Sequence, residues 1–294
     1  MSISAALVKE LRERTSAGMM ECKKALEEAG GDIQRAIEVL RKTGKTKADK
    51  KAGRVAAEGV VFIQAANDGK QAVMIEMNSE TDFVGRDENF LRFVKAVAAV
   101  ALQAKVRNVS DLNTLSLADH GNVTVEEARQ ALVAKVGENI HLRRLAFVDA
   151  ANPIGAYLHG NRIGVLVELD SPNPEIAKDI AMHIAASKPL VVAPSDVPSD
   201  WVAKEKEVYL AQAMGSGKPQ DIIEKMAQGR LKKFLDEVSL LGQPFVKDPN
   251  MTVEDLLNKN RVKVLAFTRF EVGEGIEKEK EDFVEAVMSQ VQGG

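Results

Sequence analysis

An internal repeat restricts the fold of this 294-residue chain more than any other feature. The first copy reads GVVFIQAANDGKQAVMIEMN and is followed by FLRFVKAVAAVA. The second reads IGAYLHGNRIGVLVELD and is followed by IAKDIAMHIAAS. Each copy has two strand-like runs around a turn, at Asp68-Gly69 and at His159-Gly160-Asn161, and then a helix-like run. The repeat predicts an α+β fold whose core consists of two similar hairpin-plus-helix subdomains.

The two copies differ in the loop between the second strand and the helix. Glu76 matches Glu168 and Phe90 matches Ile176, so the loops span 14 and 8 positions and the first is six residues longer. In the second copy the hairpin reaches its helix through the shorter loop, so the extra residues of the first copy are not needed to connect strand and helix. Extra loop length that carries the aromatic residue Phe83 therefore points to contact with another molecule.

The rest of the chain is mainly helical in pattern. Three short amphipathic runs open the sequence, and two longer runs joined by GSGK predict an antiparallel coiled-coil hairpin. A strand-like run, VKVLAFTRFEVGEG, and a charged helix close it. We expect a three-helix domain in 1–42, a basic linker in 43–56, core subdomains in 57–150 and in 151–200 with 241–270, a coiled-coil hairpin in 201–240, and a C-terminal helix in 271–294.

Residues 41–54 form a basic segment with seven Lys or Arg and one acid. Its net charge is +6, so the remainder of the chain carries −9 because the whole carries −3. One interpretation is an arm that binds the phosphates of RNA. A solvated linker or helix is the interpretation we favour, because no aromatic residue is interleaved for base stacking and the acidic remainder repels nucleic acid.

No catalytic or metal-binding pattern stands out. Cys22 is the single cysteine and falls on an apolar helical stripe, which favours a small buried side chain over a nucleophile. The stretch MGSGKP lacks the glycine and the hydroxyl residue of a phosphate loop. None of the four histidines has the spacing of a zinc site, and His183 is expected to be part of the packing. These absences favour a binding protein without metal or cofactor over a hydrolase with an unrecognised site.

The chain has no apolar run near the roughly 20 residues that span a bilayer. Its N-terminus, MSISAALVKELRERT, lacks the apolar core of a signal peptide. We therefore expect a cytoplasmic protein with no membrane partner.

Four stretches in series carry a resemblance to a known family: LVKELRERTSAGMMECKKAL, TDFV, HIAASKP and RFEVGEGIEK. Together they closely resemble the bacterial elongation factor Ts family, whose members are nucleotide exchange factors of the GTPase elongation factor Tu. The resemblance extends over essentially the whole chain. It implies a ubiquitin-associated-like N-terminal domain, a coiled-coil insertion and a C-terminal helical module. It also implies that elongation factor Tu is the partner, without direct nucleic-acid contact.

The resemblance assigns candidate contact residues one by one. In the family, the loop motif pushes against the GTPase near its Mg²⁺ site, and it maps without change onto Thr81, Asp82, Phe83 and Val84. Family positions that grip a helix of the GTPase map onto Arg12, Met19, Met20 and Lys23. Two further partner-facing positions map onto His159 and Val246. Lys247 departs from the apolar residue expected there, and residues 112–124 form a longer region than the family pattern.

The residues alone leave alternatives for these positions. Phe83 could pack as a staple on the following helix, and Asp82 could cap that helix. Met19 shares a helical stripe with Cys22 and is expected in the core. Met20 is turned away from this stripe by about 100° and is expected to be the better exposed contact.

Overall fold

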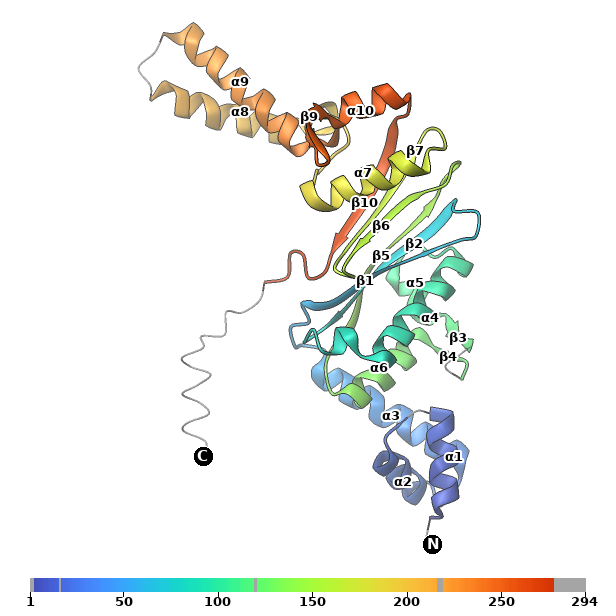
Figure 1. Cartoon of the computed structure of the whole chain (residues 1–294). Coiled ribbons are helices and arrows are strands. Elements are labelled where there is room, and N and C mark those ends of the chain that lie inside the picture. Colours follow the sequence, from blue (N-terminus) through green and yellow to red (C-terminus); the bar gives the residue numbers. More distant parts are fainter. Residues whose placement is uncertain (1–2, 16, 119–120, 216–218, 278–294) are drawn as a thin grey trace.

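The computed structural model describes residues 3–15, 17–118, 121–215 and 219–277 of an elongated α+β protein. Three helices lie at one end, two three-stranded sheets with their covering helices form the middle, and a pair of long helices lies at the other end (Figure 1). The mixed helix and sheet content agrees with the predicted fold class.

The N-terminal helices are α1 (Ala5–Thr15), α2 (Met19–Glu28) and α3 (Ile33–Lys51). They enclose a small core whose fully buried members include Leu11, Cys22 and Leu26. The predicted burial of Cys22 is thus confirmed. Asp32 caps α3 by accepting a hydrogen bond from the backbone N–H of Arg35 at 2.9 Å.

Helix α3 is longer than expected. The apolar pattern predicted an end near residue 42, yet the helix runs to Lys51 and includes most of the basic segment. The reason is a tertiary contact with α6 (Val125–Val136), because Gly44 lies against the backbone of that helix and Ala48 is buried in the next core. One continuous helix therefore joins the N-terminal helices to the first sheet.

Several side chains of the basic segment are occupied within the protein. Arg41 pairs with Glu127 at 3.8 Å and Arg54 with Glu80 at 3.4 Å. Lys47 pairs with Glu21, and Lys51 donates to the carbonyl of Gly137. Four of the seven basic residues thus bind protein groups, which favours the structural interpretation of this segment.

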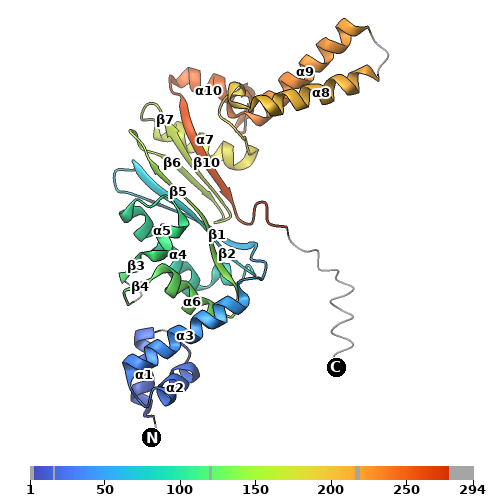
Figure 2. The same ribbon diagram turned by 180° about the vertical axis from the view of Figure 1, so that it is seen from behind.

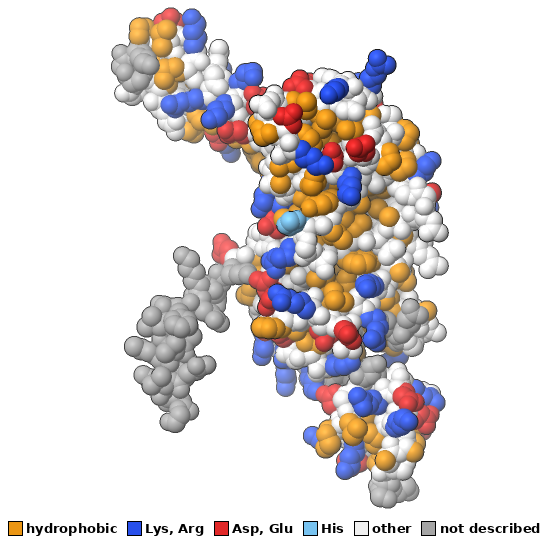
Figure 3. Space-filling model, in the orientation of Figure 1, with side chains coloured by type: hydrophobic (Ala, Val, Ile, Leu, Met, Phe, Trp, Pro, Cys, Tyr) orange, Lys and Arg blue, Asp and Glu red, His pale blue; other side chains and the backbone are white. Residues whose placement is uncertain are grey.

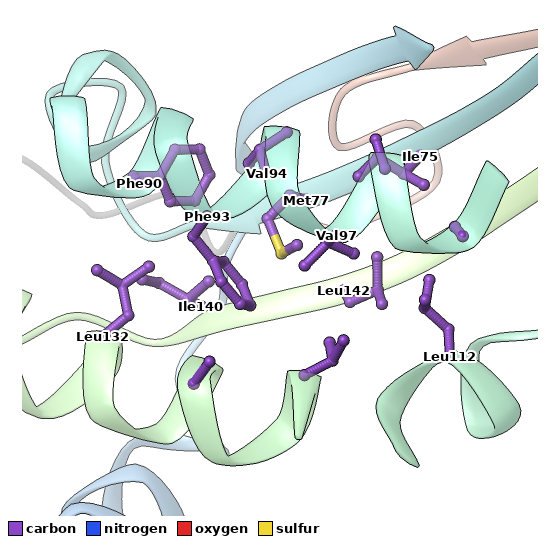
Figure 4. Packing of buried hydrophobic residues seen from close by; sticks show 14 of the residues in the cluster. Ile75, Met77, Phe90, Phe93, Val94, Val97, Leu112, Leu132, Ile140 and Leu142 are labelled. Carbon is purple, nitrogen blue, oxygen red and sulfur yellow. The ribbon is translucent and has the colours of Figure 1, made fainter. Parts of the chain in front are cut away.

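The first sheet has the antiparallel order β1-β2-β5, with β1 Glu58–Ala65, β2 Gln71–Ser79 and β5 Ile140–Asp149. Helices α4 (Glu88–Ala104), α5 (Val109–Thr114) and α6 cover one face. Figure 4 shows Phe93, Val97 and Leu142 packed between sheet and helices. Between α5 and α6 lies a short hairpin, β3 Ser116–Leu117 with β4 Val123–Thr124.

The second sheet repeats this plan in the order β10-β7-β6, with β6 Gly155–His159, β7 Ile163–Leu169 and β10 Val264–Glu271. Helix α7 (Pro174–Ser187) covers it. Beyond α7 lie β8 Pro244–Phe245, β9 Asp248–Thr252 and α10 Val253–Asn260. Both predicted hairpins are confirmed, since β1 pairs with β2 and β6 pairs with β7.

The two sheets pack against each other through the faces that their helices leave open. Strand β2 is buried on both faces: Val73, Ile75 and Met77 face α4, while Met74 lies in a cluster with Leu166 of β7. This second burial joins the two repeat units into one body.

Helices α8 (Ser199–Met214) and α9 (Gln220–Val238) form the protruding pair (Figures 1 and 2). They are the two helices expected there. The predicted C-terminal helix, with Phe283, Val287 and Val291 at fourfold spacing, lies outside the described residues. Within the parts of the chain that the structure describes, no helix is both long and apolar enough to cross a bilayer.

Glycine 155 allows α7 to lie close to β6. A Cβ at Gly155 would stand 2.6 Å from the carbonyl oxygen and 2.7 Å from the Cβ of Ala177. Gly155→Ala is therefore expected to destabilise the protein by about 1–3 kcal/mol through overpacking. Gly229→Ala on α9, where a Cβ meets nothing within 4 Å, should instead stabilise its helix by up to about 1 kcal/mol. Urea unfolding followed by circular dichroism measures both changes, and equal effects would contradict the close packing.

Candidate partner-binding site

The long loop after β2 is anchored at its start by Glu138. The backbone N–H of Thr81 donates to Oε2 of Glu138 at 3.0 Å, and the Thr81 hydroxyl donates to Oε1 at 2.7 Å. The Thr81 carbonyl accepts from the Ser79 hydroxyl at 2.8 Å. Charge-assisted bonds of this kind are stronger than neutral ones, so the first residue of the TDFV motif is held firmly.

Val84 and Asp87 anchor the other end of the loop. Val84 is 7% exposed and belongs to the first core, and the residues Val84–Arg86 form a 3-10 turn. Asp87 caps α4 by accepting from the backbone N–H groups of Asn89 and Phe90 at 2.9 and 3.0 Å. Burial alone would raise the pKa of Asp87, but these bonds outweigh it and lower the pKa.

Asp82 does not cap the helix, so the capping alternative is wrong. The cap is Asp87, five residues further on, because the 3-10 turn intervenes between the motif and α4. The Asp82 carboxylate instead accepts a hydrogen bond from Arg86 at 2.8 Å, and its side chain is 45% exposed. It therefore remains available to a partner.

Phe83 is the side chain that this loop presents to solvent. It is 78% exposed, so the alternative of a staple against α4 is wrong. A staple would bury the ring against α4, whereas the loop is held at Thr81 and Val84 with the ring in solvent. A depression of about 360 Å³ lies beside Phe83 and is lined also by Val84, Asn89, Lys135 and Val136. An aromatic ring on an anchored loop is preorganised for insertion into another protein.

His159 lies at the end of β6, in a turn that packs beside the Phe83 loop. The backbone N–H of Val61 in β1 donates to the carbonyl of Asn161 at 2.7 Å, and Arg162 pairs with Glu58. Gly85 of the loop approaches Gly59 of the same strand. The start of β1 thus brings the two predicted contact regions together. His159 is exposed, and its Nδ1 lies 3.2 Å from the hydroxyl of Tyr157.

Val246 lies in the turn between β8 and β9 and is 44% exposed. Its neighbour Lys247 forms an ion pair with Asp179 of α7 at 2.6 Å. Lys247, where the family resemblance implies an apolar residue, is thus paired within this chain.

The N-terminal candidates are all exposed, with Arg12 on α1 and the other three on α2. Met19 and Met20 are 60% and 63% exposed, and Arg12 and Lys23 are exposed as well. The expectation that Met19 is in the core is wrong. Met19 is the first residue of α2, and the buried stripe of this helix begins one turn later at Cys22.

The structure therefore brings Phe83 and His159 to one region and leaves the other candidates on different elements along the molecule. On the face drawn in Figure 3, hydrophobic side chains lie among charged ones over its whole length. Among the residues that the structure describes, no group of three or more His, Cys, Asp or Glu is placed to hold a metal ion. The exposed apolar side chains of Phe83, Met19, Met20 and Val246 are the part of this surface that favours contact with a protein partner.

Sequence reasoning missed Glu138 and the buried Glu76. Glu138 lies 57 positions from the threonine that it holds, and nothing in its own neighbourhood distinguishes it. Glu76 is an acid in an apolar strand, a signal that could have indicated a buried ion pair.

Comparison with known proteins agrees with this surface. The sequence model of the elongation factor Ts family matches residues 80–274. The protein named elongation factor Ts in Legionella pneumophila strain Philadelphia 1 is 58% identical to this chain over 291 residues, which cover 99% of both chains. The protein of the same name in Thioalkalivibrio sulfidiphilus is 55% identical to this chain over 295 residues and the full length of both. The relative in Aeromonas salmonicida is 55% identical over 99% of this chain and 97% of its own. The chain belongs to the elongation factor Ts family, translation elongation factors that act as exchange factors and not as enzymes.

Proposed function

We propose that this protein binds elongation factor Tu in its GDP complex and promotes release of GDP by disturbing the Mg²⁺ and nucleotide site, after which GTP binds. The observation that supports the proposal most directly is the exposed Phe83 on a loop that is anchored at both ends. No covalent bond is made or broken in this reaction, and the protein needs no cofactor of its own.

The energetic requirement is differential binding. A ligand with equal affinity for two states of the GTPase would shift nothing, so the exchange factor must bind the nucleotide-free arrangement more tightly. Linkage makes the effect reciprocal: the protein weakens nucleotide binding by the same factor by which nucleotide weakens binding of the protein.

Phe83 acts as a wedge between elements of the GTPase. Burial of an exposed phenylalanine contributes roughly 1.5–3 kcal/mol, and this gain is available only in the arrangement that has room for the ring. Asp82 brings a carboxylate next to the cation site and disturbs its ligands. Because Thr81 and Val84 are already fixed, little conformational entropy is lost when the motif binds.

The remaining exposed candidates extend the contact. Arg12, Met19, Met20 and Lys23 grip a helix of the GTPase, while His159 and Val246 contact it from the core. Specific protein interfaces bury roughly 800 Å² on each partner, which calls for several separated contact points.

The finer architecture is part of this proposal. We assign a ubiquitin-associated-like domain to residues 1–42 and core subdomains to 57–150 and to 151–200 with 241–270. Residues 43–56, expected as a basic linker, continue helix α3 as far as Lys51. A coiled-coil hairpin occupies 201–240 and a C-terminal helical module 271–294. The separate hydrophobic clusters of the N-terminal helices and of the two sheets support this division.

The test measures release of fluorescent GDP from elongation factor Tu with and without this protein. Release should accelerate in proportion to the protein at low concentrations and then saturate. Unchanged release would refute the proposal. An RNA- or ribosome-binding factor that uses residues 41–54 would instead bind RNA with a steep loss of affinity as salt is raised. The internal pairing of Arg41, Lys47, Lys51 and Arg54 argues against that second function.

Glu138→Ala is expected to weaken exchange although the residue is not itself in the motif. The change removes both hydrogen bonds that fix Thr81, so the loop must be ordered when it binds. We expect a loss of about tenfold or more in the efficiency of GDP release. Glu88→Ala, which removes an exposed carboxylate at the start of the nearby helix α4, is the control and should change release little. Equal effects of the two variants would contradict the anchoring role.

A further inference from the structure

The turn that carries Val246 is tied to α7 by a completely buried histidine. His183 is 0% exposed. Its Nδ1 accepts a hydrogen bond from the backbone N–H of Val246 at 3.1 Å, and its Nε2 lies 3.0 Å from Oε1 of Gln243. The expectation that His183 takes part in packing is confirmed, and its ring also lies 5.9 Å from that of Phe245.

These contacts define the protonation of the ring. A backbone N–H can only donate, so Nδ1 carries no proton and Nε2 donates to Gln243. The amide nitrogen of Gln243 in turn donates to the carbonyl of Glu237 at 2.7 Å, at the end of α9, and to that of Ser187 at 3.4 Å. Burial lowers the pKa of His183, which keeps the ring neutral.

A second side chain of α7 holds the next residue of the turn. Asp179 lies one helical turn before His183 on the same face of α7, and it pairs with Lys247. Two α7 side chains at i and i+4 thus hold two consecutive residues, Val246 and Lys247. The ion pair is half exposed on its lysine side, whereas the histidine bond is buried. The buried bond is the stronger constraint of the two.

We propose that His183 is a positioning residue that holds the exposed side chain of Val246 in the orientation in which it binds the partner. This inference rests on the proposed function and deepens it. Their neighbours Val84 and Phe245 belong to different hydrophobic clusters, so Phe83 and Val246 contribute separately. Val246 should therefore affect how tightly the partner is bound, whereas Phe83 drives the release of nucleotide. Loss of His183 should raise the concentration of protein that gives half-maximal GDP release and leave the maximal rate unchanged.

Two substitutions of His183 separate positioning from packing. In His183→Asn the side-chain oxygen occupies a place close to Nδ1 and can still accept from the Val246 N–H. In His183→Gln the amide reaches the place of Nε2 and loses that acceptor. We expect His183→Gln to raise the half-saturating concentration about tenfold, the loss of one buried hydrogen bond, and His183→Asn to stay near the wild type. A general packing defect would harm the smaller asparagine more.

The experiment follows fluorescent GDP release from elongation factor Tu over a range of protein concentrations for each variant. Glu175→Gln, which alters an exposed side chain in the first turn of the same helix, is the control and should change the half-saturating concentration little. Val246→Ala should raise it like His183→Gln, and the double variant should be no worse than Val246→Ala alone. The proposal is overturned if His183→Asn and His183→Gln raise the half-saturating concentration equally, or if the effects of His183→Gln and Val246→Ala add in the double variant. It is also overturned if Val246→Ala leaves the half-saturating concentration unchanged. The last result decides the matter even if His183→Gln fails to fold. Failure of the wild type to release GDP would refute the proposed function instead.

Discussion

Phe83→Ala is expected to slow release of GDP from elongation factor Tu by roughly 10- to 150-fold relative to the unaltered protein. The factor follows from the roughly 1.5–3 kcal/mol that burial of the ring contributes in the nucleotide-free complex. The variant should remain folded, because the side chain is 78% exposed and the loop is held by Thr81, Val84 and Asp87. Stopped-flow fluorescence of a labelled GDP measures the rate, and circular dichroism verifies the fold.

A matched control removes an equally apolar and exposed side chain elsewhere. Leu265 of β10 is 61% exposed and is not among the proposed contacts, so Leu265→Ala should leave release unchanged. Phe83→Leu, which keeps an apolar but smaller side chain, should fall between alanine and the wild type. Full activity of Phe83→Ala would exclude the wedge, and equal losses at Phe83 and Leu265 would indicate a general effect of surface hydrophobicity.

The parts of this site that depend on local sequence could be predicted. The longer loop is visible when the two repeat units are aligned, and its extra length indicated a contact role for Phe83, although the residues alone left a staple on the following helix open. The hairpin turn at Asp68-Gly69 is equally local, because it depends on the positive φ of +69° at Gly69, which favours glycine. In each case the relevant residues are close together in the chain.

The features that were missed all depend on contacts between distant segments. The extension of α3 to Lys51 is stabilised by α6, and the exposure of Met19 depends on where the neighbouring helices begin to pack. Glu138 acquires its role only when the sheet brings it beside Thr81. Periodicity along the chain contains no information on such pairings, so these could not have been derived from it.

Glu76 is the clearest case of a residue whose role is set by distant partners. It is completely buried in β2 and accepts hydrogen bonds from the backbone N–H of Gly273 at 2.8 Å and from Asn78 at 3.0 Å. Arg144 binds it at 2.5 Å and Arg143 at 3.1 Å. Since Gly273 follows the strand β10 of the second sheet, this carboxylate fastens the end of one repeat unit to the other.

The equivalent residue of the second unit has none of these partners. Glu168 of β7 is partly buried, and no hydrogen bond or ion pair to its carboxylate is found among the described residues. Burial raises the pKa of Glu168. Burial would also raise the pKa of Glu76, but the bonds from Gly273, Asn78 and Arg144 outweigh it and the pKa is lowered.

The pH dependence follows from the sign of the shift at Glu76. A carboxyl group with a lowered folded pKa stabilises the protein fully above its unfolded pKa of about 4.3. This contribution is lost as the pH falls through the folded pKa, because the proton that then binds displaces the arginines. The stability difference between the wild type and Glu76→Gln should therefore be constant near neutral pH and shrink below about pH 4.

Glu76→Gln should reduce the free energy of unfolding at pH 7 by about 2–3 kcal/mol. The value is below the roughly 3–5 kcal/mol of a fully buried pair, since Arg143 and Arg144 keep 24% and 30% of their side chains exposed and can be solvated. Glu168→Gln, the same change at the matching position, should leave stability unchanged or slightly raise it, because it removes a charge that burial disfavours. Urea unfolding of both variants at pH 7 and at pH 3 measures the differences. Equal effects at the two positions would mean that the carboxylate of Glu76 does not fasten the sheets together.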